Sequence, residues 1–179
     1  MKTRQRWVWL PLIIFIALVI VLGVGLLTRQ QDRPSARLAT SFPAFSLPSL
    51  DRQTDKEGPE LFDGQITLVN VWGSWCPSCE DEVPELLQLQ REGVRIVGIA
   101  YRDERSDALG FLERHGNPYT ANIMDADGSL SFDLGVYGAP ETFIVDAHGV
   151  IRYHHAGAIT EPLIDGQIRP LLQELAHET

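Results

Sequence analysis

The sequence predicts an α/β domain with a mixed central sheet and flanking helices. Two patterns support this fold class. Segments with strand and helix periodicity alternate along the chain, and the alternation ends in a hairpin followed by an amphipathic helix. Strands separated by helices favour parallel pairing, whereas the strands of a hairpin pair antiparallel. We therefore expect strands of both directions in one layered sheet. The 179 residues suffice for one such domain plus an additional segment.

The first half of the domain contains one weak and one strong strand pattern. Residues 42–47 alternate apolar with small side chains, which is a weak strand signal, and the charged residues 51–59 are typical of a turn region. The apolar run 66–72 predicts a buried strand. A helical pattern follows at 79–91, and Pro84 is expected to break or bend this helix because it removes a backbone hydrogen bond.

The second half of the domain is richer in strand signals. The β-rich segment 94–101 predicts a strand, and residues 106–115 carry apolar side chains at helical intervals. The further expected elements are a short strand at 121–124, a short helix at 129–134, two strands at 142–146 and 150–156 joined by a turn at 147–149, and an amphipathic helix at 161–176.

An uncleaved membrane anchor is predicted at the N-terminus. No charged residue occurs in residues 7–27, and a helix of this length, at ~1.5 Å per residue, spans roughly the ~30 Å hydrocarbon core of a bilayer. The run exceeds the usual ~7–15 apolar residues of a signal peptide, although the small residues 23–25 leave a cleaved signal as the alternative. We expect an anchor at 1–28, a linker at 29–39 and the folded domain at 40–179.

Charge restricts both the orientation of the anchor and the partners of the chain. Three basic residues precede the apolar segment and three follow it, so charge bias barely decides which end faces the cytoplasm. Without the first three, the chain retains 12 of its 15 basic residues against 24 acidic ones, a net charge of about −12. Such an acidic surface argues against nucleic acid and anionic membrane as partners.

Both cysteines lie in one motif, Trp75-Cys76-Pro77-Ser78-Cys79. The motif follows a predicted strand and opens a predicted helix, which is typical of a thioredoxin-like redox site. Free backbone N–H groups and the positive dipole end of a helix N-terminus favour a thiolate, the reactive form, on the first cysteine. The sequence therefore predicts a redox-active Cys76–Cys79 disulfide and no additional cofactor.

Two other interpretations of the motif are weaker. A structural zinc site normally takes four Cys and His ligands, but there is no second cysteine pair and the five histidines lack zinc-ligand spacing. We expect no metal site, and we expect the histidines on the surface or in the hairpin. A purely structural disulfide in so short a loop removes little entropy from the unfolded chain. Redox chemistry is therefore favoured.

Longer stretches resemble the CcmG/DsbE family of cytochrome c maturation. Residues 75–84 resemble membrane-anchored thioredoxin-like reductants, and Gly135-Val136-Tyr137-Gly138-Ala139-Pro140-Glu141-Thr142-Phe143 looks like the family signature. Residues 149–153 and 155–157 are also similar, and the similarity extends from about Phe42 to the C-terminus. The resemblance implies a thioredoxin-like fold preceded by one N-terminal transmembrane helix.

The resemblance also implies a function and partners. It implies a single-pass inner-membrane protein whose periplasmic domain is a thiol–disulfide oxidoreductase that reduces disulfides of apocytochrome c before haem attachment. The implied electron donor is a membrane thiol transporter of the CcdA/DsbD type. The chain would thus act within the cytochrome c maturation machinery.

The motif and the resemblance together suggest roles for the residues at the site. Cys76, on the loop side of the helix start, is expected to attack a substrate disulfide, and Cys79 is expected to resolve the mixed disulfide. Trp75 is expected to cover one side of the sulfur, with a core aromatic as the alternative. The resemblance implies that Pro140 is a cis proline facing the cysteines and that Ala139 offers backbone groups to a substrate strand.

Two acids are further candidate site residues. Glu82 lies three residues beyond Cys79 on the same helix face, where its carboxylate could accept the thiol proton and partial burial would raise its pKa. A solvated helix residue is the alternative. The resemblance places Glu141 in the acidic surroundings of the site, whereas the sequence alone indicates an exposed loop acid. Asn70 stands where ordinary thioredoxins carry a buried acid, which leaves more of the proton transfer to Glu82.

Three other functions are compatible with these patterns. They are the same chemistry on other extracytoplasmic substrates, a thiol peroxidase, and a non-catalytic module that binds apocytochrome. Peroxiredoxins usually have a Thr or Ser and a Pro upstream of the peroxidatic cysteine, whereas Gly73-Ser74-Trp75 stands here, which disfavours a peroxidase. A binding module would keep its function after mutation of both cysteines, whereas an enzyme would not.

Overall fold

A computed structural model of the chain describes residues 14–18, 38–52, 56–62 and 64–178. Contacts divide the chain into two units, Met1–Ser35 and Ala36–Thr179. In the first unit, residues 14–18 are helical with exposed side chains. The rest of the predicted anchor and most of the predicted linker lie outside the described residues. None of the described helices is long and apolar enough to cross a membrane.

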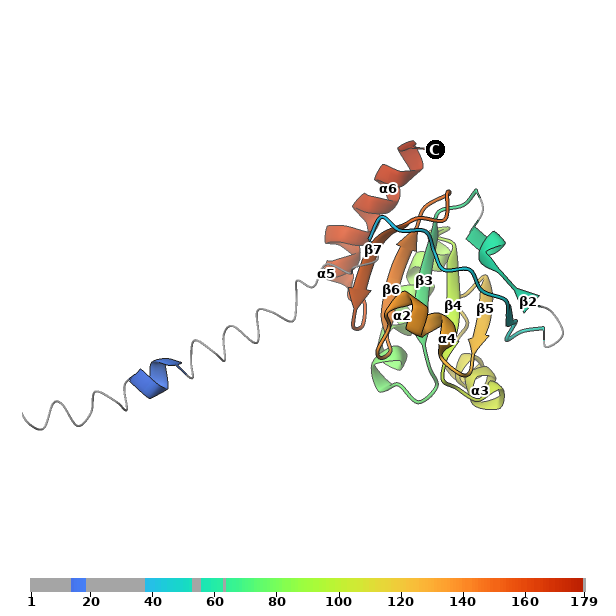
Figure 1. Cartoon of the computed structure of the whole chain (residues 1–179), viewed down its shortest axis with the longest axis horizontal. Coiled ribbons are helices and arrows are strands. Elements are labelled where there is room, and N and C mark those ends of the chain that lie inside the picture. Colours follow the sequence, from blue (N-terminus) through green and yellow to red (C-terminus); the bar gives the residue numbers. More distant parts are fainter. Residues whose placement is uncertain (1–13, 19–37, 53–55, 63, 179) are drawn as a thin grey trace, which may run out of the picture. The chain divides into compact units, whose positions relative to one another are not determined.

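The second unit is built on a five-stranded sheet (Figure 1). Strand β3 is parallel to β4, and β4 to β5, whereas β6 runs antiparallel to both β3 and β7. The expected mixed sheet is therefore confirmed. In spatial order the strands are β5 (Ala121–Asp125), β4 (Ile96–Tyr101), β3 (Thr67–Trp72), β6 (Glu141–Val145) and β7 (Ile151–Ala156).

Helices cover both faces of this sheet. Helices α2 (Pro77–Arg91) and α3 (Arg105–His115) share one buried core with the C-terminal helical segment. The other face is covered by the short 3-10 helix η1 (Pro59–Phe62), by α4 (Ser129–Leu134) and by the chain that precedes η1. The domain thus has the three-layer arrangement of an α/β fold.

Alternate residues of the central strand β3 face the two cores. Leu68 and Trp72 lie in the core shared with α2, while Val69 and Val71 lie in the core shared with α4. Asn70 stands between Leu68 and Trp72 in the alternation, so its side chain points to the α2 side. A fully buried strand therefore presents a polar amide to the helix that carries the cysteines.

The chain before η1 differs from the prediction. Residues 42–46 do not form a strand, and only β1 (Leu47–Pro48) pairs, antiparallel, with β2 (Lys56–Glu57) inside the region expected to be a turn. Phe42 packs instead against Phe62, with 4.4 Å between the ring centroids. The apolar alternation of 42–47 therefore reflects side chains that fill the core under α4, not a ladder of backbone hydrogen bonds.

Residues 39–50, here called the crossing segment, are tied to both outer strands of the sheet. Ala39 donates its N–H to the carbonyl oxygen of Ile151 in β7 over 2.8 Å. Leu50 donates its N–H to the carbonyl oxygen of Asn122 in β5 over 2.9 Å. The crossing segment therefore passes over one face of the sheet from edge to edge (Figure 1).

The C-terminal part contains one confirmed and one corrected element. The predicted hairpin is present. Its turn is closed by a hydrogen bond from the N–H of Gly149 to the carbonyl oxygen of Asp146, over 3.0 Å. The final helix is not continuous: α5 (Glu161–Leu163) and α6 (Arg169–Glu178) flank a π-helical stretch, Ile164–Ile168. Gly166, a poor α-helix former, lies in the middle of that stretch.

Helix α2 continues through Pro84. The helix begins at Pro77, a position that suits a residue without an N–H. Pro84 and Glu80, one turn apart, are both exposed, so the carbonyl group that Pro84 cannot bond lies where water can solvate it. The break considered from the sequence is therefore absent, and the cysteines stand at the start of an uninterrupted helix.

Candidate redox site

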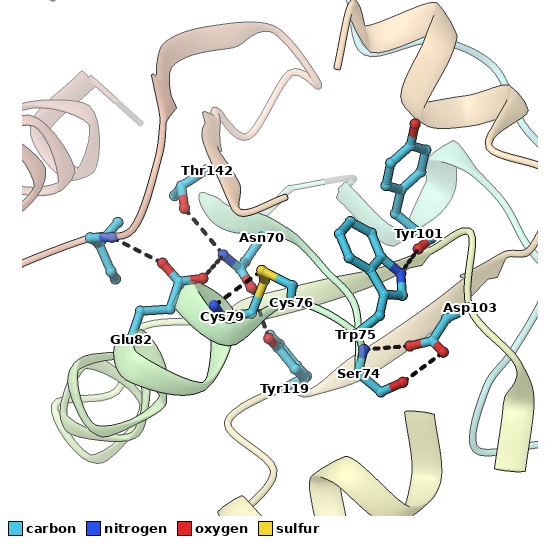
Figure 2. Close-up of a disulfide and its surroundings, with 11 residues drawn as sticks. Asn70, Ser74, Trp75, Cys76, Cys79, Glu82, Tyr101, Asp103, Tyr119 and Thr142 are labelled. Carbon is cyan, nitrogen blue, oxygen red and sulfur yellow. Dashed lines mark hydrogen bonds between the residues drawn. A yellow bond between two sulfur atoms is a disulfide. The ribbon is translucent and has the colours of Figure 1, made fainter. Parts of the chain in front are cut away.

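The cysteine pair lies at the N-terminus of α2. Cys76 caps the helix with extended backbone (φ −103°, ψ 107°), and its Cα lies 5.3 Å from that of its disulfide partner Cys79. The backbone N–H of Cys79 donates to Cys76 Sγ over 3.1 Å (Figure 2). The helix start therefore directs a hydrogen bond and its positive dipole end at the sulfur expected to attack.

Trp75 flanks the disulfide and exposes half of its surface. Its Nε1–H donates to the carbonyl oxygen of Tyr101 over 3.1 Å, and the two rings meet edge to face with 6.3 Å between centroids. These contacts hold the indole at the surface (Figure 2). Trp75 is therefore not a core aromatic, which was the alternative interpretation of this residue.

Asp103, which sequence reasoning missed, holds the turn before Cys76. Its buried carboxylate accepts the N–H of Ser74 over 2.6 Å, the hydroxyl of Ser74 over 2.8 Å and the N–H of Glu104 over 2.8 Å. The signal was available, because Asp103 comes just after the strand 94–101. Ends of parallel strands meet at one edge of a sheet, so a polar residue there lies near the cysteine turn.

Glu82 is buried on the second turn of α2. Its Oε1 accepts a hydrogen bond from Asn70 Nδ2 over 2.9 Å, and its Oε2 accepts one from the backbone N–H of Ile159 over 2.9 Å. Figure 2 shows this carboxylate and the disulfide on either side of the Asn70 amide. The alternative of a solvated helix residue is therefore wrong.

Burial raises the pKa of Glu82 from 4.5 to about 7. Loss of water around the carboxylate is the main cause, and the negative charge of Glu85 adds to it. The hydrogen bonds from Ile159 and Asn70 act in the opposite direction because they stabilise the ionised form. A carboxyl group that titrates near neutral pH can both take up and return a proton during turnover.

The turn at Ala139 and Pro140 lies on the cysteine side of the sheet. The peptide bond between these residues is cis, as the family resemblance implied. Ala139 packs against the core cluster that contains both cysteines. The carbonyl oxygen of Pro140 accepts the N–H of Gly157 over 2.9 Å, which ties the turn to the end of β7.

Glu141 is buried at the start of β6, so it is not the exposed loop acid that the sequence alone indicated. Its Oε2 lies 2.5 Å from His154 Nε2 on β7, and its Oε1 accepts the N–H of Tyr137 over 3.3 Å. The His154 ring stacks on Phe143 with 4.4 Å between centroids. His154 lies on the second strand of the hairpin, as expected, and there it is the partner of Glu141.

The two predicted acids lie on opposite faces of the sheet. Thr142 accepts a hydrogen bond from Asn70 Nδ2 over 3.2 Å, so its side chain points to the α2 side with Glu82. Its neighbour Glu141 points the other way, because successive residues of a strand alternate. The structure therefore groups Glu82 with the cysteine helix and links Glu141 instead to the cis-proline turn.

These features support thiol–disulfide exchange. A disulfide at a helix start, a buried acid that titrates near neutral pH and an exposed aromatic ring are brought together within one end of the domain. Within the described part of the chain, no group of three or more His, Cys, Asp or Glu side chains could hold a metal ion.

Comparisons with known proteins agree with this chemistry. The Redoxin family model matches residues 38–168. A thiol:disulfide interchange protein DsbE from Pseudomonas aeruginosa is 44% identical over 169 residues, which cover 94% of each chain. The DsbE of Escherichia coli K12 is 40% identical over 181 aligned positions, which cover 98% of each chain. The chain belongs to the DsbE family.

Solved structures agree on the fold of this DsbE-family chain. A secreted thiol-disulfide isomerase from Corynebacterium glutamicum superposes with a TM-score of 0.65 at 22% identity, covering 79% of this chain and 96% of the other. The thioredoxin domain of a thiol-disulfide oxidoreductase from Bacteroides vulgatus gives 0.63 at 19% identity, covering 77% and 97%. The domain therefore has a thioredoxin-like fold, which confirms the fold class expected for it.

The DsbE-family chain is a thiol–disulfide oxidoreductase. Its redox couple is the Cys76–Cys79 disulfide and the corresponding dithiol, so the exchange requires only sulfur atoms of the protein and its partner. Members of the family do this chemistry without a bound cofactor, which accords with the expectation from the sequence.

Proposed function

We propose that this chain is a membrane-anchored reductant of the periplasm that reduces disulfides of apocytochrome c before haem attachment. The segment 135–143 carries the proposal, because it resembles cytochrome c maturation proteins and forms the cis-proline turn on the cysteine side. The match over 98% of the chain to the Escherichia coli relative reaches into the N-terminal apolar residues and so supports an anchor at 1–28. The linker is then 29–39 and the catalytic domain 40–179.

The proposed reaction has two exchange steps. The thiolate of Cys76 attacks one sulfur of the substrate disulfide and expels the other sulfur as a thiolate. Cys79 then attacks Cys76 in the mixed disulfide, releases the second substrate sulfur and closes the Cys76–Cys79 bond. The substrate gains two electrons and the protein loses two. A membrane thiol transporter of the CcdA/DsbD type returns the protein to the dithiol, within the cytochrome c maturation machinery.

Glu82 is the proposed proton acceptor in the second step. Cys79 must lose its proton to attack, and Glu82 follows it by three residues on the same face of α2. A carboxyl group with a pKa of about 7 is partly ionised at neutral pH and can take that proton. The substrate thiolates released by exchange then accept protons, which leaves two thiols for haem attachment.

The remaining site residues are proposed to hold the substrate. Trp75 offers a half-exposed ring beside the disulfide, and Ala139 offers backbone groups to an extended peptide, as in pairing with a strand edge. Pro140 shapes that turn. Glu141 stabilises the turn, because its carboxylate accepts a hydrogen bond from the N–H of Tyr137 and pairs with His154 on β7.

Trapping of the mixed disulfide tests the proposal. In the full-length Cys79→Ser variant the resolving thiol is missing, so an adduct between Cys76 and apocytochrome c is expected to accumulate in cells and to appear on non-reducing gels after alkylation. The matched Cys76→Ser variant is expected to trap no comparable adduct. A folded and abundant Cys79→Ser protein without any adduct would favour a binding module, and an adduct with a different extracytoplasmic protein would favour another substrate.

Substrate preference provides a second test. The reduced full-length protein is expected to reduce an oxidised peptide with the Cys-x-x-Cys-His sequence at least about tenfold faster than a peptide of the same composition in scrambled order, because specific contacts contribute about 1.4 kcal/mol or more. Equal rates would indicate a general reductant. Consumption of hydrogen peroxide at a comparable rate would indicate a peroxidase instead.

The side of the membrane can be tested separately. A membrane-impermeant thiol reagent, applied to intact cells with a permeabilised outer membrane, is expected to label reduced Cys76. Labelling only after lysis of the inner membrane would place the domain in the cytoplasm. The mass of the purified protein should include residues 1–28 if the anchor is retained.

A further inference from the structure

The amide of Asn70 has hydrogen-bond partners at both ends. Its Oδ1 accepts the hydroxyl proton of Tyr119 over 2.8 Å, and its Nδ2 donates to Glu82 Oε1 over 2.9 Å and to Thr142 Oγ1 over 3.2 Å (Figure 2). Asn70, Glu82 and Thr142 are buried, and so is Tyr119. The amide therefore connects a tyrosine hydroxyl with the carboxylate through the interior of the domain.

The orientation of this amide decides which form of Glu82 it stabilises. An N–H donor stabilises the ionised carboxylate. A rotated amide would present its oxygen to Glu82 and favour the protonated acid, because only that form has a hydrogen to donate. The Tyr119 hydroxyl opposes the rotation. Its oxygen could accept a hydrogen bond from the rotated NH2 group, but the buried hydroxyl proton would then lose Oδ1, its acceptor among the described residues.

Tyr119 is held so that its hydroxyl has a fixed place. Its ring stacks on Trp72, with 5.5 Å between centroids and 15° between planes, and its backbone N–H donates to Asn117 Oδ1 over 3.0 Å. Among the described residues, Asn70 is the only hydrogen-bond partner of the hydroxyl. Burial, with a contribution from the charge of Glu82, raises the pKa of Tyr119 well above 10, so the hydroxyl keeps its proton.

We propose that Tyr119 is a positioning residue for the exchange reaction. Its hydroxyl locks the Asn70 amide in the orientation that stabilises the Glu82 carboxylate, and so sets the pH at which Glu82 accepts the Cys79 proton. The inference rests on the proposed role of Glu82 in the resolving step. Tyr119 touches neither substrate nor sulfur in this scheme and acts only through Asn70.

The other groups that face Glu82 do not fix this amide. The hydrogen bond from Ile159 stabilises the carboxylate without contacting Asn70, and the charge of Glu85 opposes ionisation from the same helix. Thr142 has a hydroxyl that can donate or accept, so it fits either orientation of the amide. Glu82 is thus faced by Asn70 on β3, by Glu85 and Cys79 on α2 and by Ile159 before α5. The Asn70 amide is also faced by Tyr119 before β5 and by Thr142 on β6.

Replacement of the hydroxyl alone tests the proposal. Tyr119→Phe keeps the ring stacked on Trp72 and removes the donor to Asn70. In the full-length oxidised protein, the pKa of Glu82, followed by carboxyl carbon NMR and assigned with Glu82→Gln, is expected to rise by about one unit, a roughly tenfold change in the ionisation equilibrium. The pH midpoint of the resolving step, measured by single-turnover release of a mixed disulfide, should rise equally.

A matched control and a double-mutant cycle make the test specific. Tyr153→Phe removes a tyrosine hydroxyl that donates to Gln167, on the C-terminal side of the domain, and should leave the Glu82 ionisation equilibrium within about twofold. In an Asn70→Ser background, Tyr119→Phe should likewise change it by less than about twofold. The same tenfold change in that background would overturn the proposal, as would a Tyr119→Phe variant that behaves like Tyr153→Phe.

A measurement on the unmutated protein covers the case in which Tyr119→Phe does not fold. The side-chain amide protons of Asn70 should shift with the same pH midpoint as the Glu82 carboxyl carbon, since Nδ2 donates to that carboxylate. Amide signals that do not respond to this titration would overturn the proposal. Failure to reduce apocytochrome peptide would instead count against the proposed function alone, because the carboxyl titration involves no substrate.

Discussion

Ile159 donates its backbone N–H to Glu82 Oε2 over 2.9 Å, although 77 residues separate the two in the sequence. Through this bond and the bond from Asn70, one carboxylate joins α2, the central strand β3 and the chain that leads into α5. The carboxylate proposed to accept the Cys79 proton thus also contributes to the packing of the C-terminal segment. Its protonation should therefore affect stability as well as exchange.

Glu82→Gln should remove a pH dependence of stability from the oxidised protein. The pKa of Glu82 is about 7 in the folded state against 4.5 as its ordinary value, so the folded state holds this proton more tightly. That stabilisation is complete below about pH 4.5 and is lost as the pH rises through 7. The loss amounts to about 3 kcal/mol for the wild type, because each unit of pKa difference corresponds to about 1.4 kcal/mol.

Urea unfolding of both oxidised proteins between pH 4.5 and 8 measures this difference. The difference in free energy of unfolding between the Gln variant and the wild type should grow with pH and level off above about pH 7. A pH-independent difference would show that Glu82 ionises in the folded protein as it does in water. Glu80→Gln, an exposed acid on the same helix, serves as the control.

Asp103→Ala should destabilise the turn before Cys76, the cysteine proposed to attack the substrate. The substitution leaves the N–H of Ser74 and the N–H of Glu104 without their acceptor, which we expect to cost about 1–3 kcal/mol. Unfolding in denaturant checks the loss, and Asp133→Ala, an exposed acid on α4, should stay within about 0.5 kcal/mol. Equal effects of the two changes would contradict a structural role for Asp103.

Local patterns in the sequence predicted the elements around the cysteines well. The apolar run 66–72 contains β3, and the helical pattern at 79–91 lies within α2, because burial on both sides and regular spacing are local signals. The pattern at 42–47 was misleading, since Phe42 fills the core without pairing its backbone. The π-helical stretch was also missed, because apolar spacing alone does not distinguish a wide turn from an ordinary one.

His154→Leu should destabilise the domain by about 2–3 kcal/mol. The change removes the His154 partner of a buried carboxylate, so that among the described residues the N–H of Tyr137 remains as its hydrogen-bond donor. A buried acid without its partner is costly. His154→Gln should lose less, because the amide can still donate. His148→Leu, at the exposed tip of the hairpin, is the control, and its thermal unfolding midpoint should change little. An equally small effect of His154→Leu would mean that the Glu141 pair adds nothing to the fold.

Trp75→Ala should affect exchange with protein substrates more than stability. The indole is half exposed and, within the described ranges, makes one hydrogen bond, to the carbonyl oxygen of Tyr101. Its removal should therefore cost about 1 kcal/mol of unfolding free energy. Loss of its contact surface should slow reduction of an oxidised Cys-x-x-Cys-His peptide about tenfold or more while reduction of a small aromatic disulfide changes little. Equal slowing of both reactions would assign Trp75 to the chemistry of the sulfur instead of to substrate contact.

The buried polar contacts of the site were only partly predictable. The three-residue spacing placed Glu82 on the face of Cys79, and this led to the expected rise of its pKa. The partners of Glu82 and Glu141 could not be predicted, since Ile159 and His154 approach from distant parts of the sequence. Such contacts depend on strand order and register, which local patterns do not encode.

The crossing segment has a consequence for how copies of this protein meet. Outer strands of a sheet expose unpaired backbone groups that can pair with another molecule and start aggregation. Here Ala39 hydrogen-bonds to the first residue of β7, and Leu50 hydrogen-bonds to β5. Neither outer strand therefore offers an uninterrupted row of free backbone N–H and C=O groups. A second copy that approached either edge would therefore find part of the strand already paired, which disfavours self-association through the sheet edges.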